Sequence, residues 1–305
     1  MRILFMGTPD FAVASLKRLV EDGHEICGVF TQPDKPRNRN KVTFSPVKEY
    51  ALSQGLTVYQ PVKMRDGEAL NIVRGLAPEL TVVAAYGRIL PKDILEAPKY
   101  GSINVHASIL LKYRGAAPIN WSMLNDEPET GVSIMYMAEA LDAGDVLRVA
   151  KTPIGHDETL TALWDRLAEL GAQALSETIP TLEDGTAVRT AQNEAEVTYA
   201  PMLSRELSPI DWRRSARAIS CQVRGLQPWP CAVTDAVNGE EMKLFTVEET
   251  GADTTAVPGT ILTAGKQGID MACGDGKVLR ITELQAKGGK RMAASAYLLG
   301  HPIRV

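Results

Sequence analysis

Cysteine is scarce in this sequence and never occurs as a closely spaced pair. The chain of 305 residues contains 4 cysteines, and none of them belongs to a C-x-x-C motif. This spacing argues against a zinc site and against a disulfide framework, so we expect reduced thiols. Long hydrophobic runs are also missing, including the apolar stretch of a secretory leader or a membrane helix. Together these absences predict a cytoplasmic protein.

A strong net charge is missing as well. The chain has 33 Lys and Arg against 37 Asp and Glu, which leaves a net charge of -4. This balance excludes a protein that binds nucleic acid over its whole surface, so any such contact must come from local basic patches. Gly7 follows the first predicted strand, but the dinucleotide-binding spacing G-x-G-x-x-G is absent there. An enzyme that uses a nicotinamide cofactor is therefore disfavoured.

Short β-rich runs alternate with helical patterns in the first half of the chain. The run ELTVVAA at 79–85 is nearly all apolar, as strands in the middle of a parallel sheet usually are. The alternation predicts an α/β fold with a Rossmann-like open parallel sheet. The predicted strands cover residues 2–6, 25–30, 56–59, 79–85, 102–105, 131–137 and 145–154, and the predicted helices cover residues 11–21, 46–53, 66–75, 117–124 and 159–183.

The last third of the chain has a different pattern. Residues 190–208 are polar and rich in turns, so we interpret them as a linker between an N-terminal domain of residues 1–189 and a C-terminal domain of residues 209–305. After one predicted helix at 212–224, the C-terminal domain contains short strands separated by turns. This pattern predicts a small β-barrel of the OB type.

Two polar side chains interrupt the apolar strand that begins at residue 102. Side chains alternate along a strand, so Asn104 and His106 share one face while Ile103 and Val105 occupy the other. In an open parallel sheet, ligands bind at the carboxyl ends of the strands, where this pair lies. An amide donor beside an imidazole can hold an oxyanion and move a proton, as acyl or formyl transfer to an amine requires. For a single histidine, a structural role is the more common alternative.

An acidic residue in a glycine-containing loop completes the candidate site. Asp142 follows the apolar strand at 131–137, in the stretch EALDAGDV. A carboxylate there can approach the neighbouring strand end and bias the charge and tautomer of His106. The alternative is ordinary turn chemistry, because Asp before Gly is common in tight loops. The spacing alone leaves both interpretations open.

Three motifs in order, NVHAS at 104–108, YRGAAPI at 113–119 and LDAGD at 141–145, resemble those of the folate-dependent formyltransferases. Within this family, the chain resembles the methionyl-tRNA formyltransferases over nearly its whole length. The further motifs are GTPDFA (7–12), TQPDKP (31–36), SPVK (45–48), VVAAYGRILP (82–91), TGVSIM (130–135), TYAP (198–201) and PGTI (258–261). Each motif alone is weak, but the ordered set is specific.

The resemblance implies an enzyme and its reaction. The formyl group of 10-formyltetrahydrofolate would pass to the α-amino group of initiator methionyl-tRNA, giving N-formylmethionyl-tRNA for translation initiation. The implied catalytic residues are Asn104, His106 and Asp142, and no metal is required. Asn104 and His106 would stabilise the oxyanion that forms as the amine attacks. Asp142 would position His106 and help to relay a proton.

The resemblance also implies a folate-binding wall made of two segments. Backbone groups of GRIL at 87–90 would meet the pterin, and SILL at 108–111 would line the site. The implied folate-binding residues are Arg88, Ile89, Leu90, Ser108, Ile109, Leu110 and Leu111. Core packing is the alternative for Ile89 and Leu90. Leu111 departs from the family, which generally has proline at this position.

Two basic segments are candidates for contact with tRNA. Residues 33–48 lack apolar periodicity and predict a long loop that could contact phosphates at the acceptor end of an RNA. The second segment is KGGKR at 287–291, on a type of barrel that often holds nucleic acid. The implied tRNA-binding residues are Lys35, Arg37, Arg39, Lys41, Lys287, Lys290 and Arg291. A solvated surface is the alternative for both segments, and we expect a monomer.

Other functions are compatible with parts of this pattern. The same chemistry could serve another amine, such as glycinamide ribonucleotide or a sugar nucleotide, although the basic loop and the β-rich second domain argue against the first. A catalytically silent RNA-binding protein on the same fold is the alternative from another class. The intact set of Asn104, His106 and Asp142 argues against it.

Overall fold

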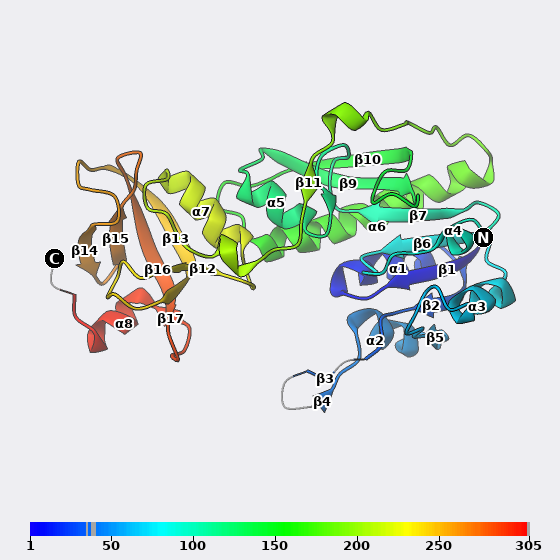
Figure 1. Cartoon of the computed structure of the whole chain (residues 1–305), viewed down its shortest axis with the longest axis horizontal. Helices are drawn as coiled ribbons and strands as arrows, with labels where there is room; N and C mark the ends of the chain where they lie inside the picture. Colours follow the sequence, from blue (N-terminus) through cyan, green and yellow to red (C-terminus); the bar gives the residue numbers. More distant parts are fainter. Residues whose placement is uncertain (35, 38–40, 304–305) are drawn as a thin grey trace. The chain divides into compact units, whose positions relative to one another are not determined.

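The structure, a computed structural model, describes residues 1–34, 36–37 and 41–303. It divides into two compact units (Figure 1). Unit 1 comprises Met1–Pro118, Glu129–Pro153 and Thr161–Ala200, and unit 2 comprises Ile119–Pro128, Ile154–Leu160 and Pro201–Val305. The final division follows Ala200, within the segment 190–208, and the domain limits expected at 189 and 209 stay a prediction.

A 7-stranded sheet forms the centre of unit 1, with the order β10-β9-β7-β6-β1-β2-β5 (Figure 1). Its strands are β1 (Arg2–Gly7), β2 (Glu25–Phe30), β5 (Val58–Tyr59), β6 (Leu80–Ala84), β7 (Ser102–His106), β9 (Glu129–Tyr136) and β10 (Val146–Pro153). The strands from β5 to β7 in this order run parallel, which confirms the predicted open α/β sheet. β9 and β10 are antiparallel to their neighbours. The short loop 137–145 between them cannot make the long crossover that a parallel pair needs.

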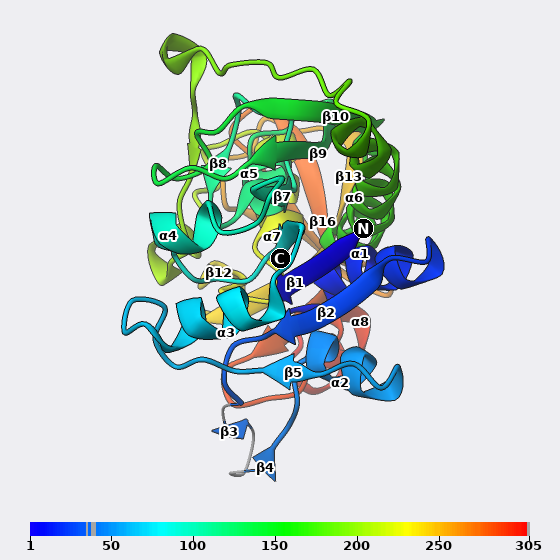
Figure 2. The ribbon, with the colours of Figure 1, turned by 90° about the vertical axis from the view of Figure 1, so that its right-hand side faces the viewer.

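Helices cover both faces of this sheet (Figure 2). The helices α1 (Asp10–Glu21) and α6 (Leu160–Glu183) lie on one side, and α3 (Glu68–Leu76) and α4 (Lys92–Leu95) lie on the other. On the second side, Leu4 and Met6 of β1 share a buried cluster with Val73 of α3 and Ile94 of α4. Burial on both faces explains why the central strands are apolar throughout. None of the helices in the described part of the chain is long and apolar enough to cross a membrane.

The helix α2 (Pro46–Ser53) shows how a local signal sets a boundary. The hydroxyl of Ser45 accepts a hydrogen bond from the backbone N–H of Lys48, and Pro46 occupies the first helical turn. Both features are typical of helix starts. The other predicted helices and strands of unit 1 also occur, with ends that differ by a few residues.

Unit 2 is built around an antiparallel sheet with the order β12-β13-β16-β15-β14, and β17 pairs with β16. Its strands are β12 (Ala232–Thr234), β13 (Met242–Asp253), β14 (Ile261–Gly265), β15 (Gly268–Ala272), β16 (Lys277–Ala286) and β17 (Met292–Ala293). The helices of this unit are α5 (Pro118–Leu124), α7 (Ala216–Gly225) and α8 (Ala294–Gly300). The predicted small β domain is confirmed. Among the described residues no ladder joins β14 to β12, so the strand pairing does not close a barrel.

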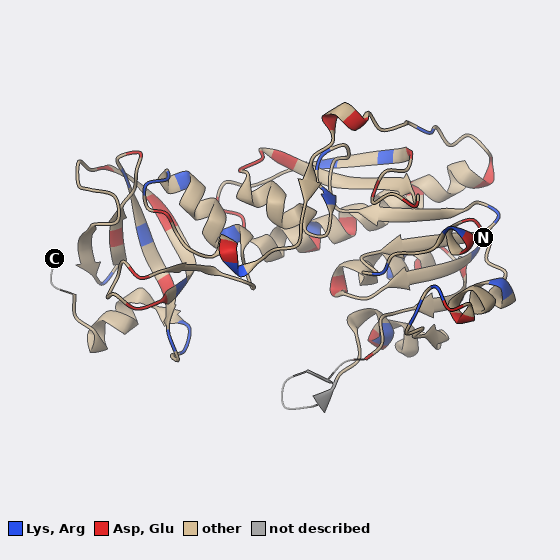
Figure 3. Ribbon diagram, viewed as in Figure 1, with Lys and Arg blue, Asp and Glu red and all other residues tan. Residues whose placement is uncertain are grey.

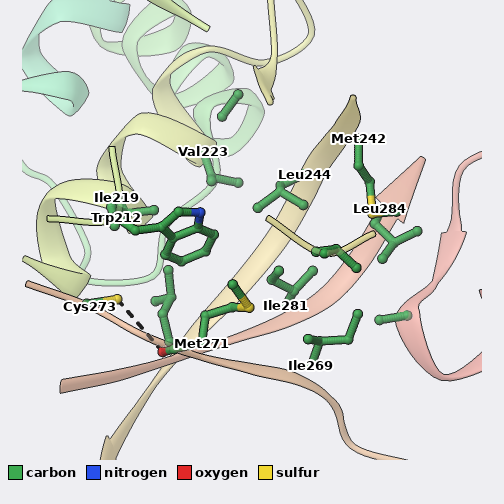
Figure 4. Close-up of a cluster of buried hydrophobic side chains, with 14 of the residues drawn as sticks. Trp212, Ile219, Val223, Met242, Leu244, Ile269, Met271, Cys273, Ile281 and Leu284 are labelled. Atoms are coloured by element: carbon green, nitrogen blue, oxygen red, sulfur yellow. Dashed lines mark hydrogen bonds between the residues drawn. The ribbon is translucent and has the colours of Figure 1, made fainter. Parts of the chain in front are cut away.

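Unit 2 has a hydrophobic core of its own (Figure 4). Trp212 and Ile219 pack with Leu244 of β13 and Ile281 of β16. The predicted start of the helix at 212 was wrong, because α7 begins after Ser215, whose hydroxyl accepts the N–H of Ala218. The segment before Ser215 instead places the Trp212 ring in the core.

All four cysteines are free thiols, as their spacing predicted. Burial raises the pKa of Cys27, Cys221 and Cys231, and burial raises the pKa of Cys273 to about 12. A raised pKa leaves little thiolate at neutral pH, so these side chains are poor nucleophiles and act as small packing groups.

Candidate active site

The strand β7 presents two polar side chains on one face of the sheet. Asn104 and His106 are 9% and 6% exposed. Val105 points to the face covered by α6, because a Cβ built on Gly171 would lie 2.8 Å from a methyl carbon of Val105. Since side chains alternate along a strand, Asn104 and His106 point to the opposite face. Both residues therefore belong to the same side of the sheet.

The loop 137–145 brings an acid to this pair. Oδ2 of Asp142 lies 3.7 Å from Nδ1 of His106. The backbone N–H of Gly115 donates a hydrogen bond of 2.8 Å to the same carboxylate oxygen. Asp142 has a φ of 49°, in the left-handed region that a short polar side chain tolerates. The structure thus places the predicted carboxylate beside the predicted imidazole.

The contacts of His106 define which ring nitrogen carries hydrogen. Nε2 lies 2.9 Å from the backbone carbonyl oxygen of Tyr113. A carbonyl oxygen only accepts, so Nε2–H is the donor. In the neutral ring, Nδ1 then carries the lone pair, and it faces Asp142. The ring can accept a proton at Nδ1, and the adjacent carboxylate then stabilises the imidazolium.

A short strand, β8 (Arg114–Gly115), holds the carboxylate of Asp142 and directly follows Tyr113, which holds His106. It runs parallel to β11 (Tyr199–Ala200). Gly115 has a φ of 124°, and a Cβ on it would lie 2.8 Å from the carbonyl oxygen of Ala200. Glycine is required at this position because other residues would be strained and would collide with the β11 backbone. The close pairing of β8 and β11 therefore fixes the N–H group that holds Asp142.

The segment 87–90 follows β6, the parallel neighbour of β7. Ile89 is 73% exposed, whereas Leu90 is only 4% exposed and packs in the core of unit 1. Nη1 of Arg88 donates to the carbonyl oxygen of Val62 at 2.9 Å. Of the predicted folate-binding side chains in this segment, Ile89 is the most exposed, Arg88 is half-buried, and Leu90 is buried, as the packing alternative expects.

The segment 108–111 follows β7 and is tied to β9. The hydroxyl of Ser133 donates to the carbonyl oxygen of Ser108 at 2.7 Å and accepts the N–H of Leu110 at 3.1 Å. The peptide bond between Leu110 and Leu111 is cis. Leu110 is buried, while Ile109 and Leu111 are half-buried. The backbone of this predicted folate wall is thus fixed by a buried serine.

The first predicted tRNA-binding segment lies in unit 1. It contains β3 (Pro36–Arg37) and β4 (Lys41–Val42), an antiparallel pair in which Arg37 is the register partner of Lys41. Lys35 and Arg39 lie outside the described residues. The segment predicted as one long loop therefore contains this short strand pair.

The second predicted tRNA-binding segment joins β16 to β17 in unit 2, and Figure 3 shows it as a basic loop. Lys287 and Lys290 are exposed there. Arg291 forms an ion pair of 2.6 Å with Glu283, and its guanidinium lies 4.4 Å from the centre of the Phe245 ring. Arg291 is thus held on the sheet, and the two lysines are the more accessible cations of this loop.

The sequence analysis missed Gln192, whose side chain donates hydrogen bonds to the backbone of the loop 137–145. The amide of Gln192 donates to the carbonyl oxygens of Asp142 and Gly144 at 2.8 and 2.7 Å. Gln192 belongs to the segment interpreted as a linker, where a glutamine carries no recognisable signal. Its acceptors are backbone carbonyls, which every residue has, so no pairing of residue types could have revealed the contact.

Comparison with known proteins identifies the family. The family described as formyl transferase matches residues 1–179, and the formyl transferase C-terminal domain matches residues 202–302. The chain belongs to the formyl transferase family. It is 48% identical over 305 residues to methionyl-tRNA formyltransferase from Citrifermentans bemidjiense, covering 100% of this chain and 95% of that protein. It is 47% identical over 300 residues to methionyl-tRNA formyltransferase from Bacillus subtilis, covering 98% of this chain and 94% of that protein.

Solved structures share the fold. An N-formyltransferase from Helicobacter canadensis, in complex with folinic acid and dTDP-3-aminofucose, has a TM-score of 0.70 at 18% identity and covers 92% of this chain and 98% of its own. HypX from Aquifex aeolicus, in complex with tetrahydrofolic acid, has a TM-score of 0.65 at 19% identity and covers 98% of this chain and 47% of its own. The resemblance predicted from the sequence is confirmed, and so is the prediction of a formyl-transferring enzyme.

Proposed function

We propose that this enzyme transfers the formyl group of 10-formyltetrahydrofolate to the α-amino group of initiator methionyl-tRNA. The relatives that are 47 and 48% identical over nearly the full chain are methionyl-tRNA formyltransferases, which makes methionyl-tRNA the acceptor. The observation that carries the catalytic assignment is the approach of the Asp142 carboxylate to within 3.7 Å of Nδ1 of His106. The product, N-formylmethionyl-tRNA, serves translation initiation in the cytoplasm.

Asn104, His106 and Asp142 each have a different role in the proposed transfer. The neutral amine attacks the formyl carbon, and negative charge develops on the formyl oxygen. The side-chain amide of Asn104 donates a hydrogen bond to this oxygen. His106 takes the proton of the attacking nitrogen at Nδ1, and Asp142 stabilises the imidazolium. As the new C–N bond forms, the bond between carbon and N10 of the folate breaks, and the proton passes to N10. The imidazolium adds positive charge on the face where the oxyanion forms.

The residues around this group fit a folate. A flat heterocycle requires backbone donors and acceptors along its edge and apolar side chains against its faces. The segment 87–90 offers backbone groups together with the exposed side chain of Ile89. Ile109 and Leu111 add half-buried apolar surface after β7. The folate supplies the reactive formyl carbon, and the protein supplies its orientation.

The tRNA would contact the basic segments. Lys35, Arg37, Arg39 and Lys41 form one cationic group in the sequence, and Lys287 and Lys290 form a second. Cationic side chains bind the phosphate backbone, and each contact releases counterions, so such binding depends strongly on salt. The expectation of a monomer stays a prediction.

One experiment separates the candidate acceptors. The purified enzyme receives 10-formyltetrahydrofolate together with methionyl-tRNA, free methionine, glycinamide ribonucleotide or an amino-sugar nucleotide, each in a separate reaction. We expect formylation of methionyl-tRNA, with the Asp142→Asn variant as the control for contaminating activity. A comparable rate with the sugar nucleotide would contradict the proposed acceptor. Binding of tRNA without formylation of any acceptor would favour a silent RNA-binding protein.

A further inference from the structure

The loop 137–145 of unit 1, called the catalytic loop below, accepts hydrogen bonds on its backbone from the side chain of Gln192. The amide nitrogen of Gln192 donates to the carbonyl oxygen of Asp142 at 2.8 Å and to that of Gly144 at 2.7 Å. These two bonds use both hydrogens of the amide. Gln192 therefore fixes the backbone on both sides of Ala143, in a loop where Asp142 already has a positive φ of 49°.

Gln192 is itself oriented by an arginine that is almost completely buried. Arg114 is 3% exposed. Its Nε and Nη2 donate to Oε1 of Gln192 at 3.1 and 2.8 Å. The two donors lock the flip state of the Gln192 amide, because the carbonyl side must face the guanidinium and the NH2 side must face the loop. A buried guanidinium needs such partners to offset its desolvation.

The other partner of Arg114 cannot take over this role. Glu194 accepts hydrogen bonds from Nη1 and Nη2 of Arg114 at 3.1 and 2.8 Å, but its side chain is 69% exposed. An exposed carboxylate is screened by water and contributes little to fixing a geometry. Of the two partners, Gln192 is the one that connects Arg114 to the catalytic loop.

Three consecutive residues at β8 converge on the catalytic pair by separate routes. The carbonyl oxygen of Tyr113 holds His106, the side chain of Arg114 holds Gln192, and the N–H of Gly115 holds the carboxylate of Asp142. The carboxylate and the backbone of Asp142 are thus fixed independently. A displacement of either one changes the distance between the carboxylate and the imidazole.

We propose that Gln192, clamped by Arg114, is a positioning residue that sets the placement of the Asp142 carboxylate against His106. This inference rests on the proposed function, because it requires Asp142 to act in formyl transfer. The mechanism is geometric: without the two N–H donors of Gln192 the loop relaxes, and the carboxylate leaves its position beside Nδ1. A misplacement of about 1 Å in such a site costs up to about 100-fold in rate.

The sharpest variant is Gln192→Glu, which keeps the size and the acceptors for Arg114. It replaces the donating NH2 group with an oxygen that faces two carbonyl oxygens. The matched control is Gln54→Glu, the same chemical change on the exposed end of α2 in unit 1. Gln192→Leu is a second variant that removes the bonds without adding a charge. Thermal unfolding of each variant gives the folded fraction for normalising the rates.

We expect Gln192→Glu and Gln192→Leu to lower kcat by about 10- to 100-fold while the KM values for folate and methionyl-tRNA stay within about threefold. Gln54→Glu keeps the kcat of the unaltered enzyme. The deciding measurement is a double-mutant cycle: in the Asp142→Asn background, Gln192→Glu should cause almost no further loss, because the group that it positions is already gone.

Three results would overturn the inference. They are an unchanged kcat in both Gln192 variants, a rise in KM at constant kcat, or the same fold-loss with and without Asp142. The single variant Asp142→Asn reports separately on the proposed function. If Asp142→Asn retained full activity, both the catalytic assignment of Asp142 and the positioning role of Gln192 would be wrong. If Asp142→Asn were inactive and the Gln192 variants kept full activity, only the positioning role of Gln192 would be excluded.

Discussion

At the scale of single residues, the two ring nitrogens of His106 have different partners. His106 has its Nε2–H fixed on a carbonyl oxygen, and Nδ1 faces Asp142 at 3.7 Å. This separation is longer than a hydrogen bond, so the carboxylate acts through its charge in the resting arrangement. The pair can shorten when Nδ1 takes a proton, which is the state that the proposed mechanism requires.

The first prediction concerns Asp142. The Asp142→Asn variant keeps the size of the side chain and an oxygen for the N–H of Gly115, but it removes the negative charge. We expect kcat to fall by about 100- to 10,000-fold, with the free energy of unfolding changed little. Initial rates at saturating folate and methionyl-tRNA test this, and near-normal turnover would remove Asp142 from the catalytic group.

The second prediction concerns Gly115. Gly115→Ala places a Cβ 2.8 Å from a backbone oxygen at a φ of 124°. We expect a loss of about 1 to 3 kcal/mol in the free energy of unfolding, together with reduced kcat. The control is Gly75→Ala in α3, where a Cβ meets nothing within 4 Å. It should stabilise the protein by about 0.5 to 1 kcal/mol. Urea unfolding compares the two, and equal effects would contradict the close approach of β8 and β11.

At the scale of elements, polar contacts between paired strands hold the site in unit 1 and stabilise the sheet of unit 2. β8 pairs with the two residues of β11, and its Gly115 holds Asp142, while Tyr113, directly before β8, holds His106. In unit 2, β15 and β16 are tied by Asp270 and Arg280, which are register partners joined by an ion pair of 2.7 Å. The β8–β11 pair and the Asp270–Arg280 ion pair belong to different sheets, so a substitution can disrupt one of them without the other.

The third prediction concerns pH and the β15–β16 pair. The hydrogen bond from Arg280 lowers the pKa of Asp270, although burial opposes the shift. A carboxyl group with a lowered folded pKa stabilises the fold above the unfolded value of about 3.9, and this stability is lost as the pH falls through the folded pKa. Asp270→Asn should therefore cost about 2 kcal/mol at pH 7 and less at low pH.

Unfolding in urea tests this prediction at pH 7 and near pH 2.5, with tryptophan fluorescence, to which the buried Trp212 of unit 2 contributes, as the signal. The matched control is Asp253→Asn. Asp253 pairs with Lys277 at 2.6 Å but is 80% exposed. We expect almost no change in the free energy of unfolding for this exposed pair, because water screens its charges. A loss in Asp270→Asn that is the same at both pH values would contradict the assignment.

At the scale of the whole molecule, the chain forms two units, each with its own hydrophobic core. The proposed catalytic residues Asn104, His106 and Asp142 all lie in unit 1, and unit 2 contains a β sheet with the exposed Lys287 and Lys290. The net charge of -4 gives no general attraction for RNA. Binding of a tRNA by this protein must therefore rely on local cations.

The fourth prediction concerns the basic segment near β4. We expect Lys41→Ala to raise the KM for methionyl-tRNA while the KM for folate stays unchanged, and to reduce the slope of log KM against log salt by roughly 1. The control is Lys17→Ala, which removes an exposed lysine of α1 that pairs with Glu21. An unchanged salt slope in Lys41→Ala would argue against phosphate contact by this segment.

Much of the fold followed from patterns that are local in the sequence. Alternating apolar runs predicted the strands of unit 1, and the polar pair in β7 pointed to the carboxyl end of the sheet. The antiparallel direction of β9 and β10 and the start of α7 at Ala216 were not predicted. They depend on loop length and on the burial of Trp212, which a strand or helix pattern does not contain.

The family and the types of side chain in the candidate site could be predicted from the order of residues, because Asn104, His106 and Asp142 stand in recognisable motifs. The groups that hold these side chains in place became visible in the folded chain. The carbonyl of Tyr113, the N–H of Gly115 and the amide of Gln192 meet the catalytic pair through backbone groups or from a distant segment. Backbone donors and acceptors are the same in every residue, so their partners are defined by three-dimensional proximity and leave no mark in the order of the side chains.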